Sequence, residues 1–396
     1  MVLEIRKARP EEMVEFNRVA ATALMMPTFD DFDRELTLCA FKDGKLVTSY
    51  AAWHLTACIN GGNAPVAGVT MVGTLPVYRR LGCLRKVTAT HFGQLHEKGE
   101  EPVTALYASR AAIYRRYGYS PVVTNCSYTV EPRYIEFAGG HEPAGIFREA
   151  GADDLETLTG LYNRFIEKRT GYLVRDDAMW KRHMNPRKRE GAQRFIVIYE
   201  ENGEPQGYVI YSAISITSGK NKGNQIISIH NLIWLTPSAY RALWEFFNRM
   251  DIIIDVSFYQ VPLDDPLPHL LLEPRRLNRT AGDGMYARIV DISRAMDKRV
   301  YDEEGTLVVK VTDDMCPWNN GTWTLTASPD GTVVQTTAES PQLEMPLSTL
   351  TMLYFGQLSA TEAARMGRLD VLKPESLPLW DRVMKTRYLP ACADHF

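Results

Sequence analysis

The sequence predicts an α/β chain made of two similar units, followed by a separate α+β unit. Two segments share one pattern, a short strand, a turn and an acidic first helical turn: Ile5–Met13 and Phe147–Leu155. Each copy later has a strand that ends beside a proline and enters a helix, at Leu75–Pro76 and at Leu235–Pro237. The same elements recurring in the same order indicate a duplicated domain.

The final third of the chain changes character. Strand-like runs separated by turns come first, at Tyr286–Asp291, Thr306–Thr312 and Thr322–Ala327, with turns at Asn319–Gly321 and Asp330–Gly331. Helical stretches follow at Leu347–Tyr354, Thr361–Met366 and Leu377–Met384. Before this unit, Pro262–Gly284 is rich in proline and arginine and has the composition of a linker. We therefore expect three domains, at residues 1–135, 136–285 and 286–396.

The composition excludes several classes of function. At 396 residues the chain is too long for one ordinary core. Its formal net charge of −3 argues against nucleic acid or an anionic membrane as a partner. The six cysteines show no CxxC or Cys/His metal spacing, so we expect reduced thiols, a cytoplasmic location and no metal. The sequence shows no signal-peptide pattern and no apolar run of about 18 residues, so we expect no membrane span.

A basic, glycine-marked turn follows the apolar strand Val69–Leu75. The turn, Arg79–Lys86, leads into a helical pattern. Gly82 would let the backbone approach an anion, and the first N–H groups of the helix would face it, so we expect a pyrophosphate site. An ordinary strand-to-helix turn with surface arginines is the alternative. The second copy has no glycine and a single arginine here, so we expect it to be catalytically silent.

The end of the strand before this turn offers a second binding feature. Gly73, Thr74 and Leu75 could present backbone N–H and C=O groups to an amide-bearing ligand lying alongside. The alternative is a plain central strand in which Gly73 marks a bulge.

Tyr114, four positions before Gly118 on a short predicted helix, is a candidate proton donor. A phenol with a pKa near 10 can protonate a departing thiolate. Its nearby competitors are Tyr107, Tyr117 and Tyr119, and Tyr114 packed at a domain edge is the structural alternative. Cys83 at a helix N-terminus also allows an acyl-cysteine route, although no base partner is evident in the sequence.

Taken together, these features resemble the coenzyme A core of the GNAT superfamily of N-acetyltransferases. More narrowly, the whole chain resembles the Eis (enhanced intracellular survival) family, including Asp313–Trp323 and Leu350–Gly367 in its last third. The resemblance implies tandem GNAT-fold domains, the second degenerate, followed by a sterol-carrier-protein-like α+β domain. Leu84 departs from the glycine or alanine usual in the superfamily, but a leucine there is familiar among Eis-like proteins.

The resemblance also implies a set of site residues. Tyr114 would be the general acid, and the C-terminal carboxylate of Phe396 would be the general base. His395 and Asp394 are rival bases, and His395 has the more suitable intrinsic pKa. The residues implied in binding acetyl-CoA are Gly73, Thr74, Leu75, Arg79, Arg80, Leu81, Gly82, Cys83, Leu84, Arg85, Lys86, Ser109 and Arg110.

The resemblance therefore implies an acetyl-CoA-dependent N-acetyltransferase. Its acceptor would be a primary amine on an aminoglycoside-like molecule, a polyamine or a lysine, and it would act as a homohexamer. Two rival functions remain: a carrier of lipid or apolar ligands built on the last domain, and a regulator that binds acyl-CoA without turnover.

Overall fold

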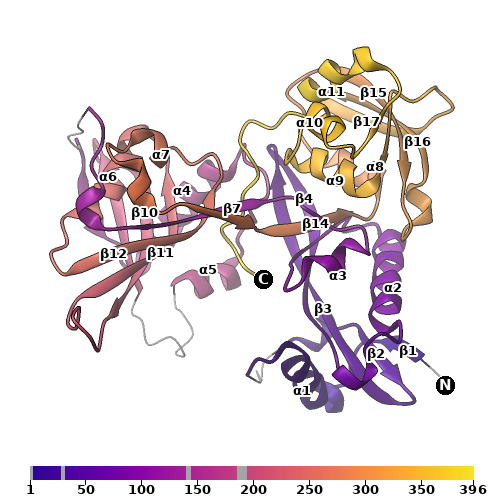
Figure 1. Cartoon of the computed structure of the whole chain (residues 1–396), viewed down its shortest axis with the longest axis horizontal. Helices are drawn as coiled ribbons and strands as arrows, with labels where there is room; N and C mark the ends of the chain where they lie inside the picture. The colour runs from indigo at the N-terminus through magenta and orange to yellow at the C-terminus, as the bar shows by residue number, and fades with distance from the viewer. Residues whose placement is uncertain (1–2, 28–31, 140–143, 185–193) are drawn as a thin grey trace. The chain divides into compact units, whose positions relative to one another are not determined.

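The computed structural model describes residues 3–27, 32–139, 144–184 and 194–396, and the chain divides into two compact units (Figure 1). Unit 1 comprises Met1–Val122, Met285–Thr386 and His395–Phe396. Unit 2 comprises Val123–Gly284 and Arg387–Asp394. The last ten residues are therefore shared between the units, since the tail contributes to unit 2 before it ends in unit 1.

The first sheet of unit 1 has the strand order β1-β2-β3-β4-β5-β14-β6. Its strands are β1 (Leu3–Arg6), β2 (Cys39–Lys42), β3 (Lys45–Ile59), β4 (Gly62–Thr74), β5 (Val103–Tyr107), β6 (Ser120–Pro121) and β14 (Met285–Ile289). The helices beside it are α1 (Met13–Leu24), α2 (Cys83–Lys98) and α3 (Ala111–Arg115). Val87, Phe92 and Leu95 on one face of α2 are buried, as their helical spacing predicts.

The sheet of unit 2 has the order β13-β7-β12-β11-β10-β9-β8. Its strands are β7 (Thr124–Val130), β8 (Ile146–Glu149), β9 (Arg194–Glu201), β10 (Glu204–Ser215), β11 (Gln225–Trp234), β12 (Ile253–Pro262) and β13 (Thr280–Asp283). Its helices are α4 (Leu155–Ile166), α5 (Asp177–Met184), α6 (Pro237–Asn248) and α7 (Leu267–Leu270). The unit therefore repeats the sequence of strand, helix and strand seen in unit 1.

One ion pair recurs in both copies and supports the duplication. Arg6 Nη1 lies 2.7 Å from Glu12 Oε2, and Arg148 Nη2 lies 2.8 Å from Asp154 Oδ1. Each of these carboxylates also accepts a backbone N–H three residues earlier, from Arg9 in the first copy and from Gly151 in the second. An acidic residue in the first turn thus ties the preceding strand to the helix in the same way twice.

The last third forms the α+β unit that the sequence predicts. Its sheet order is β17-β16-β15-β18-β19. The strands are β15 (Gly305–Thr312), β16 (Gly321–Ser328), β17 (Gly331–Thr336), β18 (Leu343–Pro346) and β19 (Asp370–Val371). The helices are α8 (Ile292–Asp297), α9 (Leu347–Phe355), α10 (Ala360–Arg365) and α11 (Leu377–Val383). Nearly all of α9 is buried, including the polar residues Thr349 and Thr351.

The structure differs from the sequence expectation at three places along the chain. β14, expected in the last domain, pairs with β5 and β6 in the first sheet. β7, expected in the first domain, pairs with β12 and β13 in unit 2. The linker interpretation of Pro262–Gly284 is wrong, because this segment forms α7 and β13 and buries Leu267 and Leu277 completely. The boundaries at 135 and 285 themselves stay a prediction.

Within the described ranges, no helix combines the length and apolar character needed to cross a bilayer.

Candidate active site

Strands β4 and β5 separate beyond Gly68. Their parallel pairing runs from Val66–Val103 to Gly68–Ala105, while β4 continues to Thr74. A register shift against β3 lies in this extension, where Met71 adopts a positive φ of 51°. Such a bulge bends the strand and increases its twist. The bend leaves the β5-facing edge of this part of β4 as a surface on which an extended ligand could pair.

The predicted strand-end residues are engaged differently from the expectation. A Cβ at Gly73 would lie 2.5 Å from Ala23 Cβ, so the glycine makes room for α1. The Leu75 N–H donates to the Val47 carbonyl at 3.0 Å. Thr74 Oγ1 lies 2.9 Å from Thr48 Oγ1. The missing side chain at Gly73 is therefore explained by helix packing, whatever binds beside the strand.

The N-terminus of α2 has the features of an anion site. Gly82 is its N-cap residue with φ 79°, and no side chain among the described residues caps the helix. The first N–H groups of a helix have no intrahelical acceptor and carry the positive end of its dipole. Arg80, Arg85 and Lys86 around them are exposed. A left-handed, uncapped glycine beside exposed cations can take a phosphate without steric cost.

Two other residues of this turn serve the fold. The Arg79 guanidinium donates to the carbonyls of Thr74 and Ala23, which fixes the strand end against α1. Cys83 is 3% exposed and belongs to the hydrophobic core under α2. This burial argues against the acyl-cysteine route, because an incoming acyl group could not reach the sulfur. Leu81 is half-exposed, and Leu84 is partly buried against the same core.

The corresponding helix of unit 2 has a different N-terminus. The Thr236 side chain caps α6 by accepting the Ala239 N–H at 3.0 Å. Pro237 follows at the first helical position and has no N–H. Thr236 Oγ1 also donates to Glu201 at 3.3 Å, which places a carboxylate at this helix end. The cap occupies one N–H group, the proline lacks another and the carboxylate opposes an anion, which supports a silent second copy.

Tyr114 lies in α3 and is 8% exposed. Burial, with a smaller effect of Tyr117, raises the pKa of Tyr114 to about 12. Its ring meets that of Tyr119 edge-on, with centroids 6.0 Å apart, inside the core that also contains Cys83. Because its pKa is raised, Tyr114 is a neutral phenol across the physiological pH range.

Ser109 and Arg110, between β5 and α3, are both exposed.

The end of the chain reaches the place where β4 and β5 separate. A Cβ at Gly68 would lie 2.9 Å from Phe396 Cδ2, and the Tyr107 ring lies 5.4 Å from the Phe396 ring. The His395 ring lies 4.2 Å from the Tyr107 ring. Gly68 is the last β4 residue paired with β5, and we call the point where the two strands separate the strand fork. Phe396 therefore packs at the fork of β4 and β5.

Asp394 has a different environment from the two residues after it. In unit 2, Asp394 Oδ1 accepts from Arg175 Nε at 3.0 Å and lies 2.6 Å from His183 Nε2. Burial opposes its ionisation, but the Arg175 charge and the His183 hydrogen bond outweigh it and lower the pKa of Asp394 to about 2. A buried carboxylate with so low a pKa is a poor base, which disfavours it as the rival to Phe396.

Two contributors to the site were missed from the sequence. Gly68 makes room for the Phe396 ring, and a glycine inside a strand is a recognised signal of close approach. Arg288 on β14 is fully buried; it donates to the Tyr117 carbonyl and to Asp313 Oδ2, both at 2.6 Å. A Cβ at Gly118 would collide with this guanidinium. Gly118 is thus explained by an arginine far away in sequence, which no local pattern reveals.

Family comparisons agree with this geometry. The description "Acetyltransferase (GNAT) domain" matches residues 4–122 and, in a second family, residues 171–289. The description "Sterol carrier protein domain" matches residues 292–393. The N-acetyltransferase Eis of Mycobacterium tuberculosis is 28% identical over 317 residues, covering 77% of this chain and 74% of that protein. The chain is an Eis-like GNAT N-acetyltransferase. The predicted tandem GNAT fold with a C-terminal sterol-carrier-like domain is confirmed.

Other relatives match most or all of the chain. An uncharacterized N-acetyltransferase of Streptomyces avermitilis is 29% identical over 371 residues, covering 91% of this chain and 88% of that protein. The structure of Eis1 from Mycobacterium abscessus superposes with a TM-score of 0.85 at 25% identity, over the whole of both chains. A GCN5-related N-acetyltransferase from Anabaena variabilis superposes with a TM-score of 0.88 at 20% identity, also over the whole of both chains. The GNAT fold implies acetyl-CoA as co-substrate, and the described residues contain no cluster of three metal-ligating side chains.

Proposed function

We propose that the protein transfers the acetyl group of acetyl-CoA directly to a primary amine in unit 1. The observation that carries the proposal is the uncapped, left-handed Gly82 at the start of α2, beside the fork of β4 and β5. Acetyl-CoA supplies the activated thioester. The residues described below bind it and move the two protons of the reaction.

The main chain from Leu81 to Lys86 holds the diphosphate in this proposal. Arg80, Arg85 and Lys86 are exposed and add positive charge, while Arg79 holds the turn in shape. The edge of β4 near Gly73 and Thr74 pairs with the amides of the pantetheine arm, since β5 has already diverged there. Ser109 and Arg110, exposed between β5 and α3, lie beside the arm.

Tyr114 donates the proton that the departing sulfur takes up. Its raised pKa, about 12, keeps the phenol protonated and available at neutral pH. The same high pKa makes complete transfer to a thiolate uphill, so donation is most effective while negative charge is still developing on the sulfur. The phenolate that results regains a proton from solvent.

The main-chain carboxylate of Phe396 accepts the proton from the amine. An amine with a pKa of about 9–10 is mostly ammonium at neutral pH, so exposing its lone pair costs roughly 3–4 kcal/mol. A carboxylate in water is a weak base, but packing at the fork would raise its pKa and bring it close to the acceptor. The half-buried Phe396 ring beside Gly68 supports this placement. The hexameric assembly stays a prediction, to be measured by light scattering.

A panel of amines tested for release of free coenzyme A thiol examines the proposal. Turnover with at least one primary amine is expected, accompanied by one acetyl group added for each thiol released. Binding of acetyl-CoA without acetylation of any amine would favour the regulator. Binding of fatty acyl chains to the last domain without thiol release would favour the carrier.

A further inference from the structure

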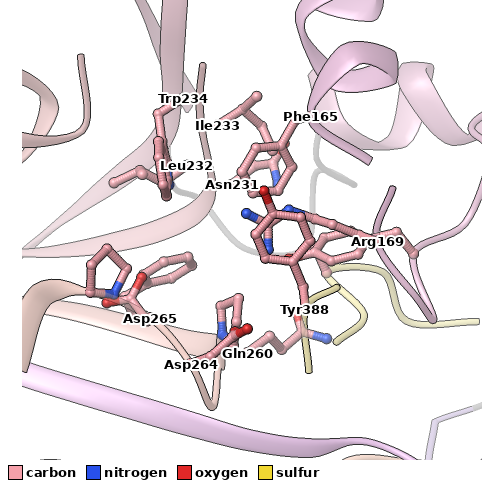
Figure 2. Close-up of a pocket in the computed structure, with 15 residues that line it drawn as sticks. Phe165, Arg169, Asn231, Leu232, Ile233, Trp234, Gln260, Asp264, Asp265 and Tyr388 are labelled. Atoms are coloured by element: carbon pink, nitrogen blue, oxygen red, sulfur yellow. The ribbon is translucent and has the colours of Figure 1, made fainter. Parts of the chain in front are cut away.

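The C-terminal tail is held by unit 2 before its last two residues. The Arg169 guanidinium lies 4.2 Å from the centroid of the Tyr388 ring, as Figure 2 shows. The Leu389 N–H donates to Asp264 Oδ2 at 2.9 Å. Tyr388 also lines a cavity of about 150 Å³ beside the ends of β11 and β12. The tail therefore packs as part of unit 2.

The next residues of the tail are enclosed by unit 2. Ala391 and Cys392 are fully buried. The Ala391 N–H donates to the Thr170 carbonyl at 2.9 Å. A Cβ at Gly171 would lie 2.7 Å from the Ala391 carbonyl oxygen, and Gly171 has a φ of 92°. A glycine is needed here, because any side chain would push the tail away.

Asp394 joins a buried polar network in unit 2. Its side chain is 1% exposed and that of its partner Arg175 is 0% exposed. Asp394 Oδ1 accepts from Arg175 Nε at 3.0 Å and from His183 Nε2 at 2.6 Å. Arg175 Nη1 donates to Asn231 Oδ1 at 3.0 Å, and the Tyr208 hydroxyl donates to the same oxygen at 2.7 Å. Hydrogen bonds thus connect β10 and β11 to the tail through Arg175.

This network is better suited to placing the tail than to stabilising unit 2. Burying an ion pair costs desolvation energy that its attraction barely repays, so apolar residues would stabilise the unit as well. Charge-assisted hydrogen bonds have a narrow geometry, however, and fix Asp394 in one position. Only His395 separates Asp394 from Phe396, so their Cα atoms are at most about 7 Å apart. An anchor at Asp394 therefore restricts the terminal carboxylate to a small volume.

We propose that Asp394, held by Arg175 and His183, is a positioning residue for the terminal carboxylate of Phe396. The second copy then has a role of its own, which is to hold the tail that supplies the base. The inference rests on the proposed function, in which that carboxylate takes the proton of the amine. A purely structural anchor would instead stabilise unit 2 without affecting where Phe396 lies.

Carboxypeptidase A, which removes C-terminal aromatic residues, measures how firmly the terminus is held. Asp394→Ala removes the acceptor of both donors, so Phe396 should be released at least about 10-fold faster, as followed by intact-protein mass. The matched control is Asp154→Ala, which removes a carboxylate of unit 2 that pairs with Arg148 at 2.8 Å. This control should leave the release rate unchanged. Equal release from Asp394→Ala and the native chain would overturn the proposal.

Kinetics separates positioning from general destabilisation. Asp394→Ala should lower kcat about 10-fold and leave the dissociation constant for acetyl-CoA unchanged, because a misplaced base slows proton transfer but not cofactor binding. In a protein extended beyond Phe396 by Gly-Ser, the same substitution should lower kcat by less than about 2-fold, since the carboxylate is already lost. Equal losses of kcat in both backgrounds would overturn the positioning role.

A second variant covers the case in which Asp394→Ala does not fold. His183→Ala removes one of the two donors, and its side chain is 16% exposed, so the change is milder. Release of Phe396 should become about 3-fold faster. Unchanged release from His183→Ala, with the variant folded by circular dichroism, would overturn the proposal.

The two readouts distinguish failure of this inference from failure of the proposed function. Acetylation of an amine combined with equal release of Phe396 from native and Asp394→Ala proteins would refute the anchor alone. Faster release from Asp394→Ala without acetylation of any amine would refute the catalytic role of the terminus, and with it the positioning role, while leaving the anchor in place.

Discussion

Helices α2 and α6 occupy equivalent places in the two copies. Their N-termini differ in the cap residue, in the first helical residue and in the neighbouring charges, all of which affect anion binding. α2 begins at an uncapped glycine with φ 79°, whereas α6 begins at a threonine whose hydroxyl accepts a backbone N–H, followed by proline. Exposed cations surround the first helix end, and Glu201 lies at the second. One scaffold thus carries two kinds of helix N-terminus, and the difference depends on a few cap residues rather than on the fold.

The two strand forks differ in a parallel way. In unit 1 the Phe396 ring packs at the fork beside Gly68, and in unit 2 a cavity remains between the ends of β11 and β12. Both units contain a parallel strand pair whose pairing ends before the strands do, β4 with β5 and β11 with β12. Residues distant in sequence, such as Phe396 in unit 1 and Tyr388 in unit 2, line the space beside each strand pair.

The largest effect is expected at the proposed acid. Tyr114→Phe should lower kcat by about 10³-fold, because the departing sulfur loses its proton donor. Acetyl-CoA binding should be retained, since the phenol is buried in the core of unit 1 rather than in the phosphate turn. The control is Tyr259→Phe, an exposed tyrosine on β12 of unit 2, which should leave kcat unchanged. Near-normal kcat in Tyr114→Phe would remove this residue from the mechanism.

Extending the chain beyond Phe396 should lower kcat by about 10²-fold, because a peptide bond replaces the carboxylate that accepts the amine's proton. Steady-state kinetics with a short C-terminal Gly-Ser extension measures this change, and a tag of equal length before Met1 is the control. Acetyl-CoA should bind both proteins with the same affinity. A fully active C-terminally extended enzyme would shift the role of base to another group.

The tail anchor in unit 2 should show a distinct pH dependence of stability. The pKa of Asp394 is about 2 in the folded protein against 3.8 as reference, so its stabilising effect is complete above about pH 4 and is lost as pH falls to about 2. The expected loss is about 2 kcal/mol. Asp394→Asn should abolish this acid-side loss, and at neutral pH it should cost about 3 kcal/mol because Arg175 stays buried without its partner.

Chemical unfolding of both proteins from pH 2 to 7 measures this difference. Asp265 acts in the opposite sense: its pKa is raised to about 6, so its contribution to stability declines as pH rises from about 4 to 6. Asp297→Asn, which alters an exposed ion pair, should change stability by less than about 0.5 kcal/mol. Parallel acid-side curves for the native chain and Asp394→Asn would show that Asp394 does not anchor the tail.

The smallest effects are expected for a matched pair of substitutions at the N-caps of α2 and α6. Gly82→Ala places a Cβ at φ 79° where a phosphate would approach, so the dissociation constant for acetyl-CoA should rise about 10-fold. Thr236→Ala should leave that constant unchanged and lower the free energy of unfolding by about 1 kcal/mol through loss of the cap. Comparable loss of affinity in both variants would mean that the helices do not differ in function.

Local patterns predicted most of the fold. The strand-turn-helix repeat, the glycine turn at Gly82 and the helices of the last third all appear as expected, because each depends on neighbouring residues. The sequence could not assign β14 to the first sheet or Phe396 to the fork at Gly68, because those contacts join residues far apart in the chain. Nor could the sequence show what surrounds two glycines: Gly73 makes room for α1, and Gly118 makes room for Arg288.

Calorimetric titration of coenzyme A into the whole chain tests the central claim most directly, because it counts the helix N-termini that bind a diphosphate. The account predicts one equivalent per chain, and pantetheine, which lacks the diphosphate, should bind about 100-fold more weakly. Two equivalents per chain, or equal affinity for pantetheine, would contradict the assignment of the diphosphate to α2.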